Sequence, residues 1–130
     1  NPGLFWYGIH GVEILYTFMG MGCKNVYCVK TEDFHFVIGE WNNNKIGTVR
    51  GIRKGSHSYG ATVFGEKKVY QVTYSTEIPL YSQLLKKIIE FFKTGIPPVA
   101  KEETLEMMKF MECALISEKE NRPVNLDEIT

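Results

Sequence analysis

The stretch Phe5-Trp6-Tyr7-Gly8-Ile9-His10-Gly11-Val12-Glu13 opens the first regular element of the chain. Apolar residues recur there at three- and four-residue steps, namely Ile9, Val12, Leu15, Tyr16 and Met19. This spacing predicts an amphipathic helix over residues 8–19 with one face in the core. Gly20 would end the helix, because glycine readily adopts the left-handed conformation that closes helices. His10 then lies in the first turn, beside large aromatic residues.

Five segments rich in β-favouring residues follow this helix, at residues 25–30, 33–41, 45–53, 59–64 and 68–75. In the second of them, alternation puts Phe34, Phe36 and Ile38 on one face and Val37 and Trp41 on the other. Turn residues at 42–44 and 65–67 join strands into hairpins. Because the connections are short, we expect the strands to be mostly antiparallel.

Two more helices are predicted in the second half of the chain. Pro79 suits the first turn of one of them, and Gly95 ends it. Its expected core stripe consists of Leu80, Leu84, Ile88 and Phe91 or Phe92. The other begins near Lys101, with a core stripe of Leu105, Met108, Met111 and Leu115, and a short extended segment follows at 121–126. The expected fold class is α+β, a mostly antiparallel sheet of about five strands with three helices packed on one face.

Composition favours a compact domain in the cytoplasm. The chain has 130 residues, of which 44% are hydrophobic and 23% are charged, so disorder is not expected. Lys plus Arg and Asp plus Glu each number 15, which argues against nucleic acid or an anionic membrane as the main partner. No apolar run approaches the ~20 residues of a membrane span.

Three cysteines, Cys23, Cys28 and Cys113, are too few for a disulfide scaffold. Odd spacing on one strand would put Cys23 and Cys28 on opposite faces, so without a bulge they cannot hold one metal ion together. His35 and His57 do not stand at zinc-ligand spacing either. We expect free, mostly buried thiols and no metal site.

The opening stretch resembles the histidine-bearing helix of the Gfo/Idh/MocA oxidoreductases, the family of glucose–fructose oxidoreductase and inositol dehydrogenase. The resemblance covers nearly the whole chain and continues through residues 20–23, 46–53, 59–67, 91–99 and 102–106. It implies that residues 1–130 are the C-terminal domain, of the glyceraldehyde-3-phosphate dehydrogenase-like type, that binds substrate and mediates oligomerisation. The chain opens with Asn1 rather than Met. We therefore expect a dinucleotide-binding domain that precedes it.

The resemblance also implies a site. His10 aligns with the family's catalytic or substrate-binding histidine, which would accept a hydroxyl proton from a sugar, inositol or related polyol while hydride leaves for nicotinamide. The chain departs from the family at Trp6, where an aspartate is usual. Trp6 would stack on a carbohydrate ring, with Tyr7 and His57 as further substrate contacts. Glu13, three residues after His10, is close enough to permit contact.

No cofactor-binding residue is predicted within the chain. The nearest candidate for a phosphate loop, residues 20–25, has two glycines instead of three and follows a helix instead of a strand. We therefore expect NAD or NADP to be bound by the parent protein, and the fragment alone to be inactive.

Two expected partners follow from the same reasoning: the dinucleotide-binding domain, and a second copy that meets the sheet face left bare by the helices. An ordinary half-solvated sheet is the alternative for that face. For the function, the alternative is a non-catalytic binding or assembly module that keeps the family fold, which the Trp6 departure favours. An independent interaction domain without dehydrogenase ancestry is a third.

Overall fold

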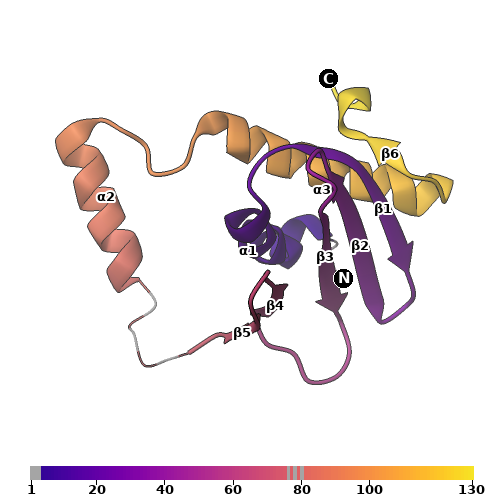
Figure 1. Cartoon of the computed structure of the whole chain (residues 1–130), viewed down its shortest axis with the longest axis horizontal. Coiled ribbons are helices and arrows are strands. Elements are labelled where there is room, and N and C mark those ends of the chain that lie inside the picture. The colour runs from indigo at the N-terminus through magenta and orange to yellow at the C-terminus, as the bar shows by residue number, and fades with distance from the viewer. Residues whose placement is uncertain (1–3, 76, 78, 80) are drawn as a thin grey trace.

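A four-stranded antiparallel sheet forms the centre of the computed structural model, which describes residues 4–75, 77, 79 and 81–130 (Figure 1). Its strand order is β3-β2-β1-β6. The bounds are β1 (Cys23–Lys30), β2 (Phe34–Trp41), β3 (Ile46–Ile52) and β6 (Val124–Asn125). The β2–β3 hairpin closes through the asparagine run, where Asn44 takes a positive φ of 60°. The predicted turn therefore forms as asparagine chemistry suggests.

Two helices, α1 (Ile9–Met19) and α3 (Lys101–Glu120), cover one face of this sheet. The layer between them contains the aromatic rings of Tyr16, Trp41 and Phe110, each almost fully buried. The Tyr16 ring meets the other two edge-on, at 5.7 and 5.9 Å between centroids. Gly39 makes this close approach possible, since a Cβ there would lie 2.7 Å from both Trp41 and Phe110. Gly47 on β3 leaves similar room, since a Cβ there would lie 3.1 Å from Trp41 and 2.7 Å from Leu15.

The opposite face of the sheet is open and largely apolar. Its apolar residues come from three strands: Tyr27, Val29, Phe34, Phe36, Ile38 and Ile52. Two polar residues of β3 share this face, Arg50 opposite Phe36 and Thr48 opposite Ile38. Phe36 is 40% exposed and Val29 47% exposed. The predicted alternation in β2 is confirmed, because Val37 and Trp41 are buried on the face that the helices cover. We call the open set the sheet face.

The remaining strands, β4 (Gly60–Phe64) and β5 (Val69–Thr73), pair only with each other in a two-stranded hairpin. The hairpin packs on α1 through β4. The fold class is confirmed as α+β with three helices and mostly antiparallel strands. The five predicted strands divide between two sheets, and β6, from the predicted extended segment of the tail, completes the larger one.

The second helix, α2 (Ser82–Thr94), stands apart from the rest of the chain (Figure 1). None of its described residues is buried, so the expected core stripe at Leu84, Ile88 and Phe91 or Phe92 is wrong as a core stripe of this chain. The expected Leu80 lies outside the described residues. The physical reason is that α1 and α3 already occupy the covered face of the sheet.

The buried side of α3 is also offset from the prediction. Its core residues are Met107, Phe110, Met111, Cys113, Ala114 and Ser117. Leu105 is 59% exposed, although the pattern assigned it to the core. Apolar residues stand at adjacent positions of this helix, so the sequence is compatible with two alternative buried faces, rotated by about one residue. The ring of Phe110 selects the observed face, because it fills the space beside Trp41.

The cysteines differ from expectation in one respect. The β1–β2 register shifts between Cys23 and Asn25, and this bulge turns both Cys23 and Cys28 inward, so the expectation of opposite faces is wrong. All three thiols are free and buried, as predicted. Burial raises the pKa of Cys23 to about 12 and those of Cys28 and Cys113 to about 11. Thiols in this state carry little thiolate near neutral pH and react slowly.

No helix among the described residues is both long and apolar enough to cross a membrane.

Candidate functional site

The aromatic pair in front of His10 lies in a π-helical turn, η1 (Leu4–Gly8), that runs directly into α1. Trp6 is 68% exposed and Tyr7 64% exposed. Gly8 leaves room for the buried Leu4 side chain in this turn, because a Cβ there would lie 2.6 Å from Leu4 Cδ1 and the leucine would have to shift. Wide π turns are rare and are frequent at functional sites. The turn therefore presents two large aromatic side chains to the surface immediately before the histidine.

His10 is the second residue of α1, and its side chain is 53% exposed. Its Nδ1 lies 3.0 Å from Glu13 Oε2, which is one helical turn further on. A carboxylate only accepts hydrogen bonds, so Nδ1 carries the hydrogen and donates it to Glu13. The neutral ring then keeps the lone pair of Nε2 for a proton from outside. This arrangement suits a general base.

Tyr59 contacts the same histidine from a distant part of the sequence. The two rings meet edge-on, with centroids 5.7 Å apart and planes at 88°. Tyr59 directly precedes β4, and its carbonyl accepts a hydrogen bond from the Tyr74 backbone at 2.9 Å. The hairpin therefore holds Tyr59 against α1. Tyr59 had only a weak sequence signal, its place at the start of a predicted strand.

The structure brings the predicted site residues together only in part. His10 joins Glu13 and Tyr59, and Trp6 and Tyr7 precede it in η1. His57 is exposed, and its Nδ1 lies 3.2 Å from the carbonyl oxygen of Gly55 in the same loop. Glu13 gives His10 a carboxylate partner. It follows the histidine in the sequence, whereas Trp6 precedes it. Helical spacing permitted this contact without deciding it.

The glycine-rich turn after α1 does not fit a dinucleotide phosphate. Gly20 ends α1 with φ 68°, and its N–H donates to Tyr16 O at 2.8 Å. The next backbone N–H groups, of Gly22 and Cys23, donate to Glu106 Oε1 on α3 at 2.8 and 3.0 Å. A carboxylate of the same chain thus fills the position where a phosphate would bind. This observation agrees with the sequence prediction that the turn closes a helix.

A second polar cluster joins α3 to the sheet. His35 is buried, with Nε2 2.9 Å from Glu118 Oε2 and Nδ1 2.8 Å from Arg53 Nη2. Because arginine only donates, Nδ1 accepts and Nε2–H donates to Glu118. Burial alone would raise the pKa of Glu118, but hydrogen bonds from Lys30 and His35 hold it below its usual range. The contact between His35 and Glu118 joins α3 to the sheet, while Arg53 Nη1 is buried without a hydrogen-bond partner among the described residues.

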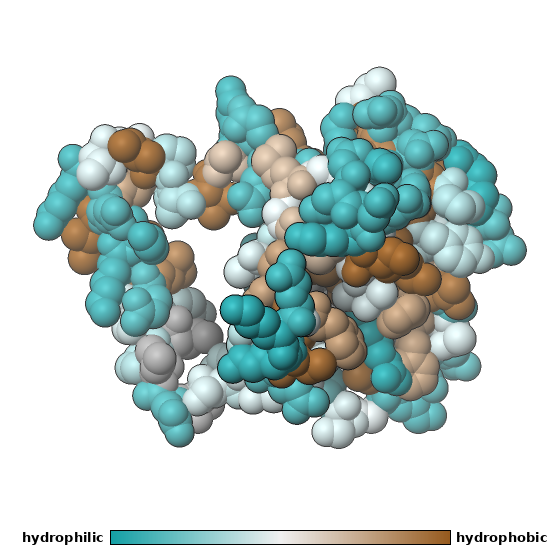
Figure 2. Space-filling model, in the orientation of Figure 1, coloured by the Kyte–Doolittle hydropathy of each residue, from teal (hydrophilic) through white to brown (hydrophobic). Residues whose placement is uncertain are grey.

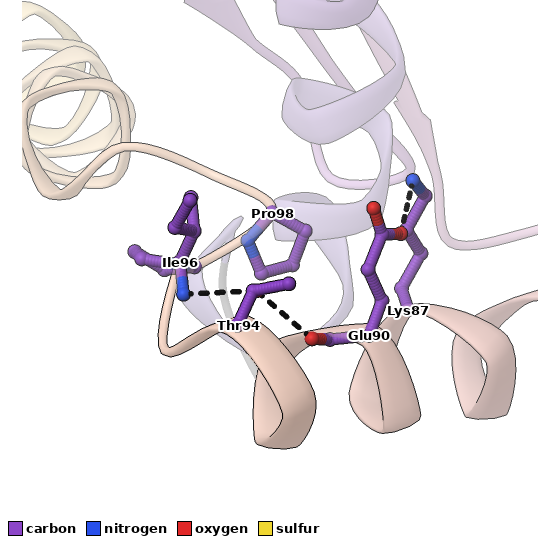
Figure 3. A pocket seen from close by; sticks show the side chains of 6 residues that line it. Lys87, Glu90, Thr94, Ile96 and Pro98 are labelled. Carbon is purple, nitrogen blue, oxygen red and sulfur yellow. Dashed lines mark hydrogen bonds and ion pairs between the residues drawn. The ribbon is translucent and has the colours of Figure 1, made fainter.

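A shallow pocket at the C-terminal end of α2 offers no better site (Figure 3). It is lined by Lys87, Glu90, Thr94, Ile96, Pro97 and Pro98. Its polar groups already bond to one another, with Lys87 Nζ 2.9 Å from Glu90 Oε2 and Thr94 Oγ1 2.9 Å from Glu90 O. Across the described parts of the chain, no group of three or more His, Cys, Asp and Glu side chains could hold a metal ion.

The fold is shared with two solved structures of proteins described as oxidoreductases or dehydrogenases. One is a probable dehydrogenase from Thermotoga maritima, with a TM-score of 0.79 and 21% identity, which matches 98% of this chain and 51% of its own. The other is a putative NADPH-dependent oxidoreductase from Desulfitobacterium hafniense, with a TM-score of 0.78 and 14% identity over 97% of this chain and 48% of its own.

The chain therefore spans about half the length of these structures. No protein-family model matches the sequence, and neither does any curated protein. At these identities the likeness establishes the fold, an α+β domain that occurs in oxidoreductases.

Proposed function

We propose that residues 1–130 form the C-terminal, substrate-side domain of an NAD(P)-dependent oxidoreductase of the Gfo/Idh/MocA type. The proposed substrate is a sugar, an inositol or a related polyol. The observation that carries the proposal is the His10–Glu13 pair, exposed at the start of α1 with Nε2 free to accept a proton. The shared fold and the sequence resemblance support it.

In the proposed reaction His10 acts as the general base. Removing the proton of a substrate hydroxyl raises electron density on its oxygen, and this assists departure of hydride from the same carbon. Glu13 holds the imidazole in the tautomer that accepts at Nε2, and it stabilises the charge that develops on the ring. His10 thus has a carboxylate partner, although Trp6 replaces the aspartate that the family pattern would place before it.

The hydride acceptor would belong to another domain. Glu106 occupies the glycine turn of this chain, so no cradle for a pyrophosphate is available there. A dinucleotide-binding domain before residue 1 would bring a nicotinamide to the substrate at His10, and the chain alone would be inactive.

Substrate contacts are proposed for the exposed rings around the base. Trp6 and Tyr7 in η1 offer flat, exposed surfaces on which a sugar or cyclitol ring can stack, and Tyr59 contacts the ring of His10. His57 lies in the loop before Tyr59 and is a further candidate for a hydroxyl contact.

The sheet face is proposed as the contact between two copies of the protein. Phe36 and Val29 are exposed side by side on this face, and contiguous exposed apolar residues often mark interaction sites. A non-catalytic assembly module is the second candidate function, and Trp6 in place of the aspartate is the observation that favours it.

Turnover by the parent protein tests the proposal. Purified parent is assayed with a panel of sugars and inositols, each with NAD⁺ and with NADP⁺, and nicotinamide reduction is recorded. We expect reduction with at least one polyol. If the parent binds either nucleotide but oxidises no member of the panel, the result favours the second candidate function, a non-catalytic assembly module.

A further inference from the structure

Helix α2 has a complete amphipathic pattern but no partner among the described residues. Its apolar residues recur at the three- and four-residue spacing of a single helical face: Leu84, Leu85, Ile88, Ile89, Phe91 and Phe92. The opposite face carries Lys86, Lys93 and Glu90. Such a helix normally buries its apolar face against other elements. Here Leu85 is 55%, Ile89 53% and Phe92 79% exposed.

The β4–β5 hairpin packs on α1 through β4 but also exposes an apolar pair. Phe64 and Val69 lie directly opposite each other on one face of the hairpin and are 82% and 54% exposed. Figure 2 shows open space between α2 and the rest of the molecule, with apolar residues on the helix. Hairpin and helix together form an arm that leaves the body after β3 and returns at α3 (Figure 1). An arm with this much exposed apolar surface requires something to pack against.

The arm is anchored at the proposed active site. Its first residues reach α1 through Tyr59, whose ring meets the ring of His10. A domain that packs against the arm therefore lies close to His10, the proposed proton acceptor. A nicotinamide that accepts hydride from a substrate bound at His10 must lie next to that substrate, so the domain that carries it also lies close to the hairpin that contacts His10. By contrast, the sheet face lies on the other side of β1–β3, away from α1.

We propose that α2 and the β4–β5 hairpin form a docking arm for the dinucleotide-binding domain of the same polypeptide. The proposal rests on the function proposed above, and it names the surface through which the two domains meet. The matched solved structures contain about as much chain again outside the region shared with this one, so an occupant of suitable size exists in that arrangement. Two separate apolar surfaces thus have two occupants, the partner domain on the arm and a second copy on the sheet face.

Hydrogen exchange of the parent protein tests this docking. We expect α2 amides to be protected in the parent, at a level that does not change with protein concentration. The double variant Leu85→Glu/Ile89→Glu puts charges on the apolar face and should speed α2 exchange about tenfold or more. The control Gln83→Glu/Lys86→Glu puts charges on the polar face of the same helix and should leave it unchanged. Amides of β2 report whether the domain stays folded.

A milder variant, Phe92→Ala, replaces the double variant if β2 also loses protection. Cross-linking gives an independent measurement: Lys86 and Lys93 should link within one polypeptide to lysines outside residues 1–130. Fast exchange throughout α2 of the wild-type parent would overturn the docking. Protection that rises with concentration, or links only between two polypeptides, would assign the arm to a second copy instead.

Activity enters neither readout, so the two proposals fail separately. An active parent with an unprotected α2 overturns only the docking. A docked arm in a parent without turnover overturns only the enzyme.

Discussion

His10 owes its chemistry to two neighbours that occupy different places in the sequence. Glu13 fixes the ring tautomer from one helical turn away, and Tyr59 borders the ring from the start of the hairpin. The position of His10 in the first turn of a helix was predictable, because it follows from local apolar spacing. Helical spacing permits several rotamers of His10 and Glu13, and only some of them bring the two side chains into contact. Contact between His10 and Tyr59 depends on how a distant hairpin packs. Neither can be read from local pattern.

Replacing Glu13 tests its role as a positioning residue. In Glu13→Gln the carboxylate charge is lost, so the imidazolium that forms during proton transfer is less stabilised. We expect kcat of the parent to fall about fivefold, since an exposed ion pair contributes up to about 1 kcal/mol. KM should stay within about twofold, because the interaction strengthens only in the transition state. The exposed Glu32→Gln variant is the control, and an equal loss of kcat in both would remove Glu13 from the site.

Secondary-structure elements were predictable where turn chemistry and alternation are local. The β2–β3 hairpin, the end of α1 at Gly20 and the tail strand all follow from residues within a few positions. The β1 bulge and the face of α3 were not predictable, because each depends on packing between distant elements. The buried thiols were correctly expected, but only the bulge explains how Cys23 and Cys28 both point inward.

Glu106 joins α3 to the turn between α1 and β1, and replacing it tests how much this connection stabilises the fold. In Glu106→Ala the N–H groups of Gly22 and Cys23 lose their acceptor in a partly buried place. The free energy of unfolding should fall by about 1–3 kcal/mol, as expected for part-buried donors left without a partner. Exposed Glu112→Ala on the same helix should change it by less than about 0.5 kcal/mol. Urea unfolding measures both, and equal values would contradict the assigned role.

At the scale of the whole molecule, the described residues form a well-buried core and leave the sheet face and the apolar face of α2 uncovered. Sequence reasoning anticipated the bare sheet face, because apolar residues alternate on both sides of β2. It placed the apolar stripe of α2 in the core of this chain, where the structure has no room for it. Hydrophobic periodicity indicates which face of a helix is buried in a protein, without stating which part of the protein buries it.

The sheet face carries a prediction about assembly. Phe36→Lys puts a positive charge at the centre of that face, directly opposite Arg50 on β3. It should shift the parent to monomers, since two like charges without a partner are strongly unfavourable in an apolar contact. Phe18→Glu alters a phenylalanine of α1 that is 45% exposed and lies outside both the sheet face and the docking arm, and it should leave the oligomer intact. Sedimentation velocity at several concentrations reports the result. A wild-type parent that is monomeric throughout would show that the sheet face is half-solvated instead.

The most direct test of the central claim is the paired measurement of kcat and melting temperature for His10→Ala in the parent protein. If His10 accepts the substrate proton, kcat should fall by about 10²–10⁴-fold, the usual contribution of general acid–base catalysis. KM should change less, and the melting temperature should stay close to that of the wild type because the side chain is exposed. Near-normal turnover in a folded His10→Ala protein would contradict the account, whatever happens to its stability.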